Sequence, residues 1–297
     1  MNNIYMNNFF NIEKLGVIID NKFFIDNEKD GNNINGPTLV KVPNFVLNKL
    51  GNYYLYFAHH QGKYIRMAYS DNICGPYTLY KGGVLSVKNT PGKDHIASPE
   101  IIIKENKFIL YYHTVYNSGY NIQSTFVAES YDGLSFVSTH TNISHPYFRY
   151  FEYQSNSYGI AMNGYRGQHI YNFINNAIID KNDILENTRH CHVKQIKDKL
   201  FIFYSVVGDC PEHICFSELC KNKDGTFYTL EQKSLIYPEL EYEHNNSAPI
   251  KSKYGASFEK INQLRDPYVY VEEDNVYILY SICGEQGIAI SKLHILI

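Results

Sequence analysis

The sequence repeats one pattern five times, and this repeat constrains the fold more than any other feature. Each copy has an alternating apolar strand, a short polar turn and an aromatic-rich strand, which is the pattern of a β-hairpin. The copies are VPNFVLNKLGNYYLYFAHH (42–60), ASPEIIIKENKFILYYHTVY (97–116), FRYFEYQSNSYGIAMNGY (148–165), RHCHVKQIKDKLFIFYSVVG (189–208) and RDPYVYVEEDNVYILYSICG (265–284). Such a period predicts one supersecondary unit per copy.

Further strands extend each hairpin. A third alternating strand follows every copy, at 64–70, 123–130, 169–176, 213–219 and 287–293, and a weaker fourth strand follows most copies, as at 77–82 and 136–142. Four-stranded antiparallel units in this number predict an all-β chain folded as one five-bladed β-propeller, a single domain over 1–297. We expect residues 16–26 to complete the last blade and residues 221–263 to add a strand pair and an irregular loop.

The composition agrees with a β-protein and excludes some partners. Tyr occurs 28 times and Phe 17 times, while Trp is absent, so Tyr and Phe fill the core. With a net charge of −3 and no basic cluster, the chain is not expected to bind nucleic acid or a membrane surface. No signal peptide or membrane-length apolar run is present, which predicts a cytoplasmic protein.

The six cysteines are irregularly spaced, which suits reduced thiols better than a disulfide framework. Cys210, Cys215 and Cys220 lie near His190, His192 and His213 in the sequence, so a metal site of soft ligands is one reading. No CxxC pair is present, and this spacing along strands more often gives small core residues. We therefore expect no metal and no cofactor, and a core position for Cys191.

One rim of a propeller collects the starts of the innermost strands and the loops that return to the same face. Here these positions are rich in His, Arg and carboxylates rather than Ser, Thr, Asn and Gly. The strand starts supply Asn44, Asp94, His95, Ser98, Arg149, Arg189, His190, Arg265 and Asp266, and the loops supply His59, His60, His113, Tyr116, Arg166, His169, Asp209, Glu212 and Glu285.

Two motifs carry a resemblance to known enzymes. Arg265-Asp266-Pro267 opens an innermost strand, and AESYDGLSF (128–136) is similar to a turn motif of outer strands. With the blade pattern, these features resemble the five-bladed propeller glycosidases, glycoside hydrolase families 43, 32 and 68 and the mannoside phosphorylases of family 130. The resemblance implies that Asp266 stabilises the positive charge of the sugar in the transition state.

The chain departs from these families in three respects. Their first blade begins with a carboxylate base, whereas the first hairpin here opens with Val42-Pro43-Asn44. Their Arg-Asp-Pro lies in an early blade, whereas here it lies in the last. Their acid is a glutamate near the middle of the chain, for which Glu152 is a candidate by position alone.

Cleavage of a glycoside needs a proton donor and a second carboxylate. Glu100 lies two residues after Ser98, which aligns with Asp266, so strand alternation points Glu100 to the channel. We predict that Asp266, Glu100 and His95 form the catalytic centre. The structural alternatives are that Glu100 pairs with an arginine, and that Asp266 caps a turn and pairs with Arg265.

Other rim residues are predicted to bind substrate, a carbohydrate or sugar phosphate: Arg265, His59, His60, His113, Arg166, Arg189, His190, Asp94 and Tyr116. Arg149, Arg166, Arg189 and Arg265 together could recognise a phosphate or carboxylate.

Two classes of function follow from the sequence. The first is an enzyme acting at a glycosidic or anomeric centre by hydrolysis, phosphorolysis or transfer, on an intracellular oligosaccharide or an intermediate of surface-polysaccharide synthesis. The second is a non-catalytic propeller that binds a glycan or a protein, having lost the first-blade carboxylate. An enzyme should bring two carboxylates within roughly 5 to 10 Å of each other at the channel mouth.

Overall fold

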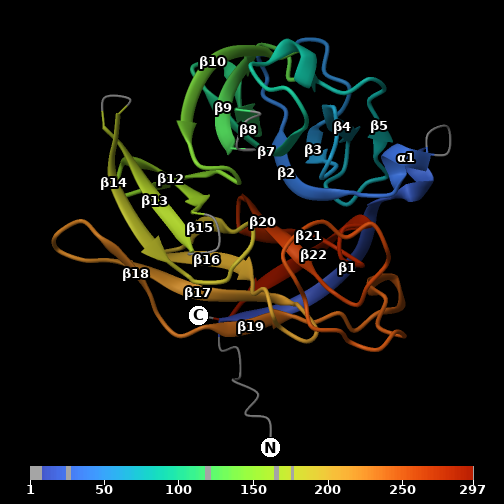
Figure 1. Cartoon of the computed structure of the whole chain (residues 1–297), viewed down its shortest axis with the longest axis vertical. Coiled ribbons are helices and arrows are strands. Elements are labelled where there is room, and N and C mark those ends of the chain that lie inside the picture. The colour runs from blue at the N-terminus through green and yellow to red at the C-terminus, as the bar shows by residue number, and fades with distance from the viewer. Residues whose placement is uncertain (1–8, 25–27, 118–121, 164–166, 175–176, 297) are drawn as a thin grey trace, which may run out of the picture.

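The strands form five antiparallel blades arranged as a β-propeller (Figure 1). The structure is a computed structural model that describes residues 9–24, 28–117, 122–163, 167–174 and 177–296. Within those ranges, no helix has the length and apolar character that spanning a membrane requires. The all-β fold class predicted from the sequence is confirmed.

Each blade is built mainly from strands that follow one another in the chain. Blade 1 contains β2 (Asn35–Lys41), β3 (Tyr53–Ala58), β4 (Tyr64–Ser70), β5 (Thr78–Leu79) and β6 (Leu85–Ser86). Blade 2 contains β7 (Ile96–Lys104), β8 (Lys107–Asn117), β9 (Ile122–Ser130) and β10 (Val137–Ser144). Blade 3 contains β11 (Arg149–Tyr153), β12 (Asn156–Met162), β13 (Gln168–Ile174) and β14 (Ala177–Ile184).

Blade 4 contains β15 (His192–Ile196), β16 (Lys199–Ser205), β17 (Ile214–Lys221), β18 (Phe227–Thr229) and β19 (Lys233–Ile236). Blade 5 contains β20 (Arg265–Glu272), β21 (Asn275–Ser281), β22 (Gly287–Ile295) and β1 (Phe10–Asp20). The short helical segments are η1 (Asn21–Phe24), α1 (Glu28–Gly31), η2 (Val87–Asn89) and η3 (Glu241–Glu243).

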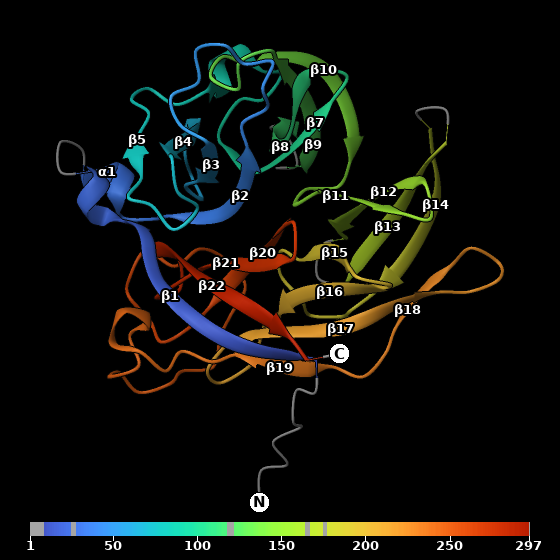
Figure 2. The same ribbon diagram turned by 180° about the vertical axis from the view of Figure 1, so that it is seen from behind.

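The two ends of the chain close the ring. Strand β1 pairs antiparallel with β22 from Phe10 opposite Ile295 to Asp20 opposite Gly287, and the two strands run side by side in both views (Figures 1 and 2). The N-terminal run completes the last blade, as expected, but the strand begins earlier than residues 16–26, at Phe10, and ends at Asp20. Residues 21–24 form η1, and residues 25–26 lie outside the described part of the chain. The short strands β18 and β19 both pair with β17 and correspond to the predicted extra strand pair.

The first hairpin was placed too late in the sequence. Its innermost strand is β2, and residues 42–52 form the connection to β3. Val42 N donates to Asn52 O at 2.8 Å and Val46 N donates to Pro43 O at 3.2 Å, so the residues expected as a strand form a closed loop instead. The other four hairpins lie within a few residues of their predicted positions.

Three innermost strands share an unusual start. Gly36, Ser98 and Asp266 have φ of 59°, 51° and 50°, and a proline follows each of them. The strand pairing slips at the same place in each of these blades. Such a bulge re-aims a side chain and is common next to active sites, so blades 1, 2 and 5 present equivalent positions at one end of the channel.

The hydrophobic core lies between neighbouring blades. Tyr54 and Tyr56 of blade 1 pack with Phe108 and Tyr112 of blade 2. Comparable clusters join blades 3 and 4, blades 4 and 5, and blades 5 and 1. The cluster between blades 2 and 3 is small, with Phe148, Ala161 and Tyr171 as its buried members. Packing between blades therefore fixes the ring.

The closing strand offers a test of this packing. Ile19 of β1 is fully buried where blades 5 and 1 meet, so Ile19→Ala should lower the free energy of unfolding by about 3 kcal/mol. Val17, in the same strand, is 37% exposed, and Val17→Ala should cost less than about 1 kcal/mol. Urea denaturation of both variants measures the difference. Equal losses would show that β1 does not close the core.

Candidate functional site

The bulged strand starts open onto a cavity of about 460 Å³ at one end of the channel. All five blades line it: Asn35 and His60 come from blade 1, Ser98 and His113 from blade 2, Tyr147 from blade 3, Arg189 and His190 from blade 4, and Asp266 and Glu285 from blade 5. A concave site with a few convergent polar groups is the usual form of a small-molecule site.

Asp266 faces this cavity from a left-handed backbone position. Asp tolerates this conformation at a cost of about 1 kcal/mol or more, and such positions cluster at functional sites. Its Oδ2 accepts a hydrogen bond from Ser281 Oγ at 3.3 Å. Burial and the negative charge of Glu285 raise the pKa of Asp266 to about 6, against the charges of Arg189 and Arg265. Asp266 can therefore hold a proton in mildly acidic solution.

Glu285 faces the same cavity and is held ionised. Its Oε2 accepts from Asn33 at 2.6 Å and Asn35 at 3.1 Å, and its Oε1 accepts from Arg265 at 3.0 Å. Burial works to raise the pKa of Glu285, but the bond and charge of His60 and the charge of Arg265 lower it well below its usual range. His60, 3.6 Å away, has its pKa raised by Glu285 despite its own burial.

The arginines of the rim are already paired. Arg265 contacts Glu285 and Glu212, and Arg189 donates to Glu212 at 2.7 Å and to the carbonyl of Lys253. Arg265 thus pairs with two glutamates, whereas the next residue in the same strand, Asp266, faces the cavity. Because carboxylates offset these charges, the described arginines do not support the expected anion subsite.

Neutral histidines form much of the cavity wall. His113 and His190 are buried, and burial lowers the pKa of each well below its usual range. Among the described residues, His113 Nδ1 and His190 Nε2 have no hydrogen-bond partner. Tyr147 packs between them, 4.6 Å from the His113 ring and 5.4 Å from the His190 ring. Uncharged rings with free nitrogens suit recognition of hydroxyl groups.

Arg149 and Glu100 close the channel beneath the cavity. Arg149 Nη1 donates to Glu100 Oε2 at 2.8 Å and to Pro99 O at 2.8 Å, and its Nη2 donates to Pro37 O at 3.1 Å. Both side chains are buried. Glu100 lines a second cavity, of about 510 Å³, further along the innermost strands together with His192 and Tyr268. The upper cavity therefore has a floor.

The structure separates the predicted site residues into two groups. His60, His113, Arg189, His190 and Asp266 line the upper cavity. Glu100, His59, His95, Asp94, Tyr116 and Arg265 do not. Arg166 lies outside the described residues.

Each residue of the second group has other contacts. Glu100 is ion-paired with Arg149, the structural alternative that the sequence left open. His95 packs edge-on against His113, and His59 contacts Asn32 Oδ1 at 2.9 Å. Asp94 is exposed and binds Lys63, and Tyr116 is exposed beside Phe126. None of these residues lines the upper cavity.

Two features of the site were not assigned a role from the sequence. Gly36 occupies the first-blade position equivalent to Asp266, and a Cβ there would lie 3.8 Å from the His190 ring. The shared dipeptides Gly36-Pro37, Ser98-Pro99 and Asp266-Pro267 were the available signal. The sequence placed Glu285 at the rim but gave it no catalytic role. Its hydrogen-bond partners, Asn33 and Arg265, belong to segments of the chain that come together with Glu285 only in the folded protein.

The chain is similar in sequence to a viral protein. The chain is 32% identical over 300 residues to the uncharacterized protein R118 of Acanthamoeba polyphaga mimivirus, covering 88% of this chain and 83% of that protein. No protein-family model matches.

Among solved structures, CoXyl43, a GH43 β-xylosidase/α-arabinofuranosidase from a compost microbial metagenome in complex with xylotriose, aligns with a TM-score of 0.61 at 13% identity, covering 96% of this chain and 93% of that one. The Cellvibrio cellulosa α-L-arabinanase complexed with arabinohexaose aligns with a TM-score of 0.60 at 11% identity, covering 88% and 92%. The resemblance to propeller glycosidases is confirmed for the fold.

The pKa of Asp266 predicts how stability changes with pH. An unfolded aspartate titrates near pH 4, so between about pH 4 and 6 the folded chain holds a proton that the unfolded chain has lost. Wild-type stability therefore falls as pH rises through this window. Asp266→Asn cannot ionise and should be more stable than wild type by about 2 to 3 kcal/mol at pH 8, with no such advantage at pH 4.

Urea denaturation at both pH values measures this difference. Asp94→Asn is the control, because Asp94 is mostly exposed and its replacement should change stability little at either pH. If Asp266→Asn and wild type show the same dependence on pH, Asp266 is not a buried, protonated carboxyl group.

Proposed function

The chain belongs to the family of the mimivirus protein R118, and we propose that this propeller cleaves a glycosidic bond in its upper cavity, with Asp266 as the proton donor. The observation that carries the proposal is a pair of carboxyl groups at one cavity, whose pKa values the surroundings move in opposite directions. Such divergence assigns acid and base roles in enzymes that work near neutral pH.

Glu285 has a supporting role in this proposal. Its oxygens already accept hydrogen bonds from Asn33, Asn35 and Arg265, so it is a poor nucleophile. A fixed negative charge beside the cavity stabilises the oxocarbenium-like transition state of glycoside cleavage. This is the role that the family resemblance gave to Asp266, whereas the raised pKa of Asp266 favours the acid.

His190 is our candidate general base, and its Nε2, which is buried from solvent in this structure, must gain contact with water when substrate binds. It lines the cavity, burial keeps it neutral, and its Nε2 has no partner among the described residues. The ring atoms nearest to a Cβ at Gly36 are Cε1 and Nδ1 of His190, each 3.8 Å away. A neutral imidazole at that place supplies a general base without a carboxylate.

The shape and charge of the cavity favour one class of substrate. The floor formed by Arg149 and Glu100 allows entry from one side, which suits the end of a sugar chain. Among the described residues, Arg189 and Arg265 are paired with glutamates, which favours water over phosphate as the acceptor. An intracellular oligosaccharide or an intermediate of surface-polysaccharide synthesis stays the predicted substrate.

A panel of aryl glycosides, including the xylosides and arabinofuranosides that correspond to the structural neighbours, tests the proposal. On a responsive substrate, kcat should fall as pH rises above about 6, because Asp266 then loses its proton. Asp266→Asn should remain folded and lose about 10²- to 10⁴-fold in kcat. Asp94→Asn should keep its activity. Unchanged turnover by Asp266→Asn would refute the acid role.

A glycan-binding propeller without catalysis is the second candidate. It is favoured by Gly36 in place of a first-blade carboxylate and by the full set of contacts around Glu285. In that case calorimetry should detect oligosaccharide binding to wild type and to Asp266→Asn alike, with no turnover by either protein.

A further inference from the structure

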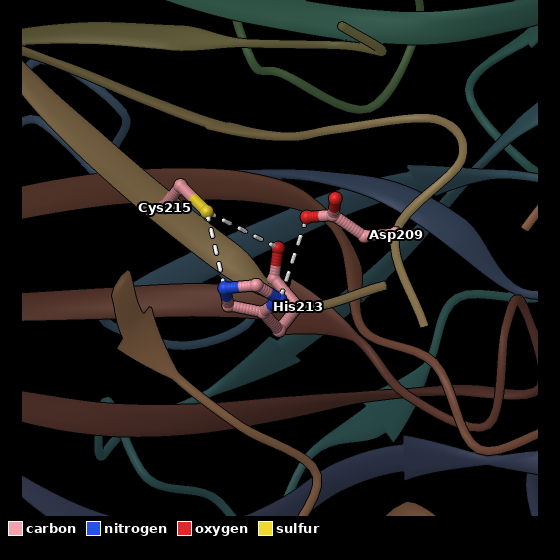
Figure 3. Close-up of side chains that lie close together, drawn as sticks. All are labelled: Asp209, His213 and Cys215. Carbon is pink, nitrogen blue, oxygen red and sulfur yellow. Dashed lines mark hydrogen bonds and ion pairs between the residues drawn. The ribbon is translucent and has the colours of Figure 1, made fainter. Parts of the chain in front are cut away.

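Three potential metal ligands meet on blade 4, and none of them lines the upper cavity. Asp209 and His213 belong to the loop between β16 and β17, and Cys215 is the second residue of β17. Figure 3 shows the imidazole of His213 between the carboxylate and the thiol. We propose that these three side chains bind a transition-metal ion of the Zn²⁺ class.

The distances suit a single ion. Cys215 Sγ lies 3.3 Å from His213 Nε2, and Asp209 Oδ2 lies 3.6 Å from His213 Nδ1. One ligand atom from each residue lies within 4.8 Å of the other two. Some point then lies within about 2.8 Å of all three atoms, and small side-chain shifts reach the Zn²⁺ bond lengths of about 2.0 to 2.3 Å.

One movement of the imidazole aligns the ligands. Nδ1 and Nε2 face different partners, whereas a metal ion takes only one ring nitrogen. A half-turn about the Cβ–Cγ bond places Nε2 where Cε1 lies, between the carboxylate and the thiol. The ring stacks on Tyr237, with centroids 4.1 Å apart and planes 12° apart. A half-turn leaves the plane of the ring in place, so this stacking is retained.

Neighbouring side chains support these ligands. Gln232 Nε2 donates to Cys215 Sγ at 3.6 Å, which favours a sulfur that carries negative charge. Outer partners of this kind hold metal ligands in place. Ser234 Oγ, which lies 2.9 Å from His213 Nε2 in this structure, would give up that contact when Nε2 turns to the ion. The carboxylate of Asp209 is 32% exposed and gives an ion a path from solvent.

An ion here would brace the wall of the upper cavity. Glu212, between the ligands in sequence, contacts Arg189 and Arg265. Asp209 O accepts from Ser252 N at 3.0 Å, which anchors the segment that leads to Tyr254. The coordinated thiol would release its proton on binding, so affinity should rise with pH.

Co²⁺ is the probe, because its thiolate charge-transfer band reports coordination by sulfur directly. The full chain, treated with a chelator and then titrated, should bind one equivalent with this band and with the visible spectrum of a tetrahedral site. Cys215→Ser should lose the band and weaken binding at least about 100-fold. Cys220→Ser, in the same strand, is the matched control and should retain both.

Asp209→Asn provides a second variant, because its partly exposed side chain can change without disturbing the core. It should weaken Co²⁺ binding at least about 10-fold and keep the sulfur band. Zn²⁺ should raise the Tm of wild type and not that of Cys215→Ser. A wild type without the band, or a band that persists in Cys215→Ser, would overturn the proposal and leave a thiol hydrogen-bonded to His213.

Discussion

The buried ion pair of Arg149 and Glu100 joins the blades at the axis of the propeller. Arg149, at the start of β11, reaches the carbonyls of Pro37 in β2 and Pro99 in β7, and its guanidinium lies 5.3 Å from the ring of Tyr268 in β20. Residues from the innermost strands of four of the five blades therefore meet around this guanidinium group. Breaking one side of such a pair leaves a charge uncompensated in the interior, which typically costs 3 to 5 kcal/mol.

This contact also defines the cavity above it. Without a floor the channel would be a pore, and the groups at its mouth would face water on both sides. With the floor in place, Asp266 and Glu285 are desolvated together, and the contacts of each decide which one keeps a proton. Glu285 has four polar neighbours in Asn33, Asn35, His60 and Arg265, whereas Asp266 has Ser281. Burial and the charge of Glu285 raise the pKa of Asp266, whereas the hydrogen bonds and positive charges around Glu285 outweigh its own burial and lower its pKa.

The comparison with propeller glycosidases is informative where it fails. The first-blade position is a glycine with the same left-handed backbone as Asp266, so the geometry that presents a carboxylate is kept while the carboxylate is absent. Glycine adopts this conformation without strain. The charged groups that meet at this end of the channel come from two neighbouring blades, 4 and 5, as Arg189, Glu212, Arg265, Asp266 and Glu285.

The sequence by itself determined the number of blades, the order of strands and the closure of the last blade, because alternation and turns act over short stretches of chain. It misplaced the first hairpin, since residues 42–46 alternate like a strand and only the pairing of β2 with β3 excludes them. It also selected Asp266, His60, His113 and His190, which line the cavity, because strand starts are readable locally, but not which of the predicted histidines face it, since His59 and His95 do not.

Only the tertiary structure decided which side chains face which. Alternation from Ser98 pointed Glu100 to the predicted site, but the bulge at Ser98 breaks that alternation, and Glu100 pairs with Arg149 in the floor and lines the second cavity instead. Arg265 turns to Glu212 and Glu285 rather than to its neighbour Asp266. The pairs Glu100–Arg149 and Arg265–Glu212 join residues from different blades, and Arg265–Glu285 joins two separate segments of blade 5. Burial sets the energies of all three pairs, so none of them can be read from a short stretch of the chain.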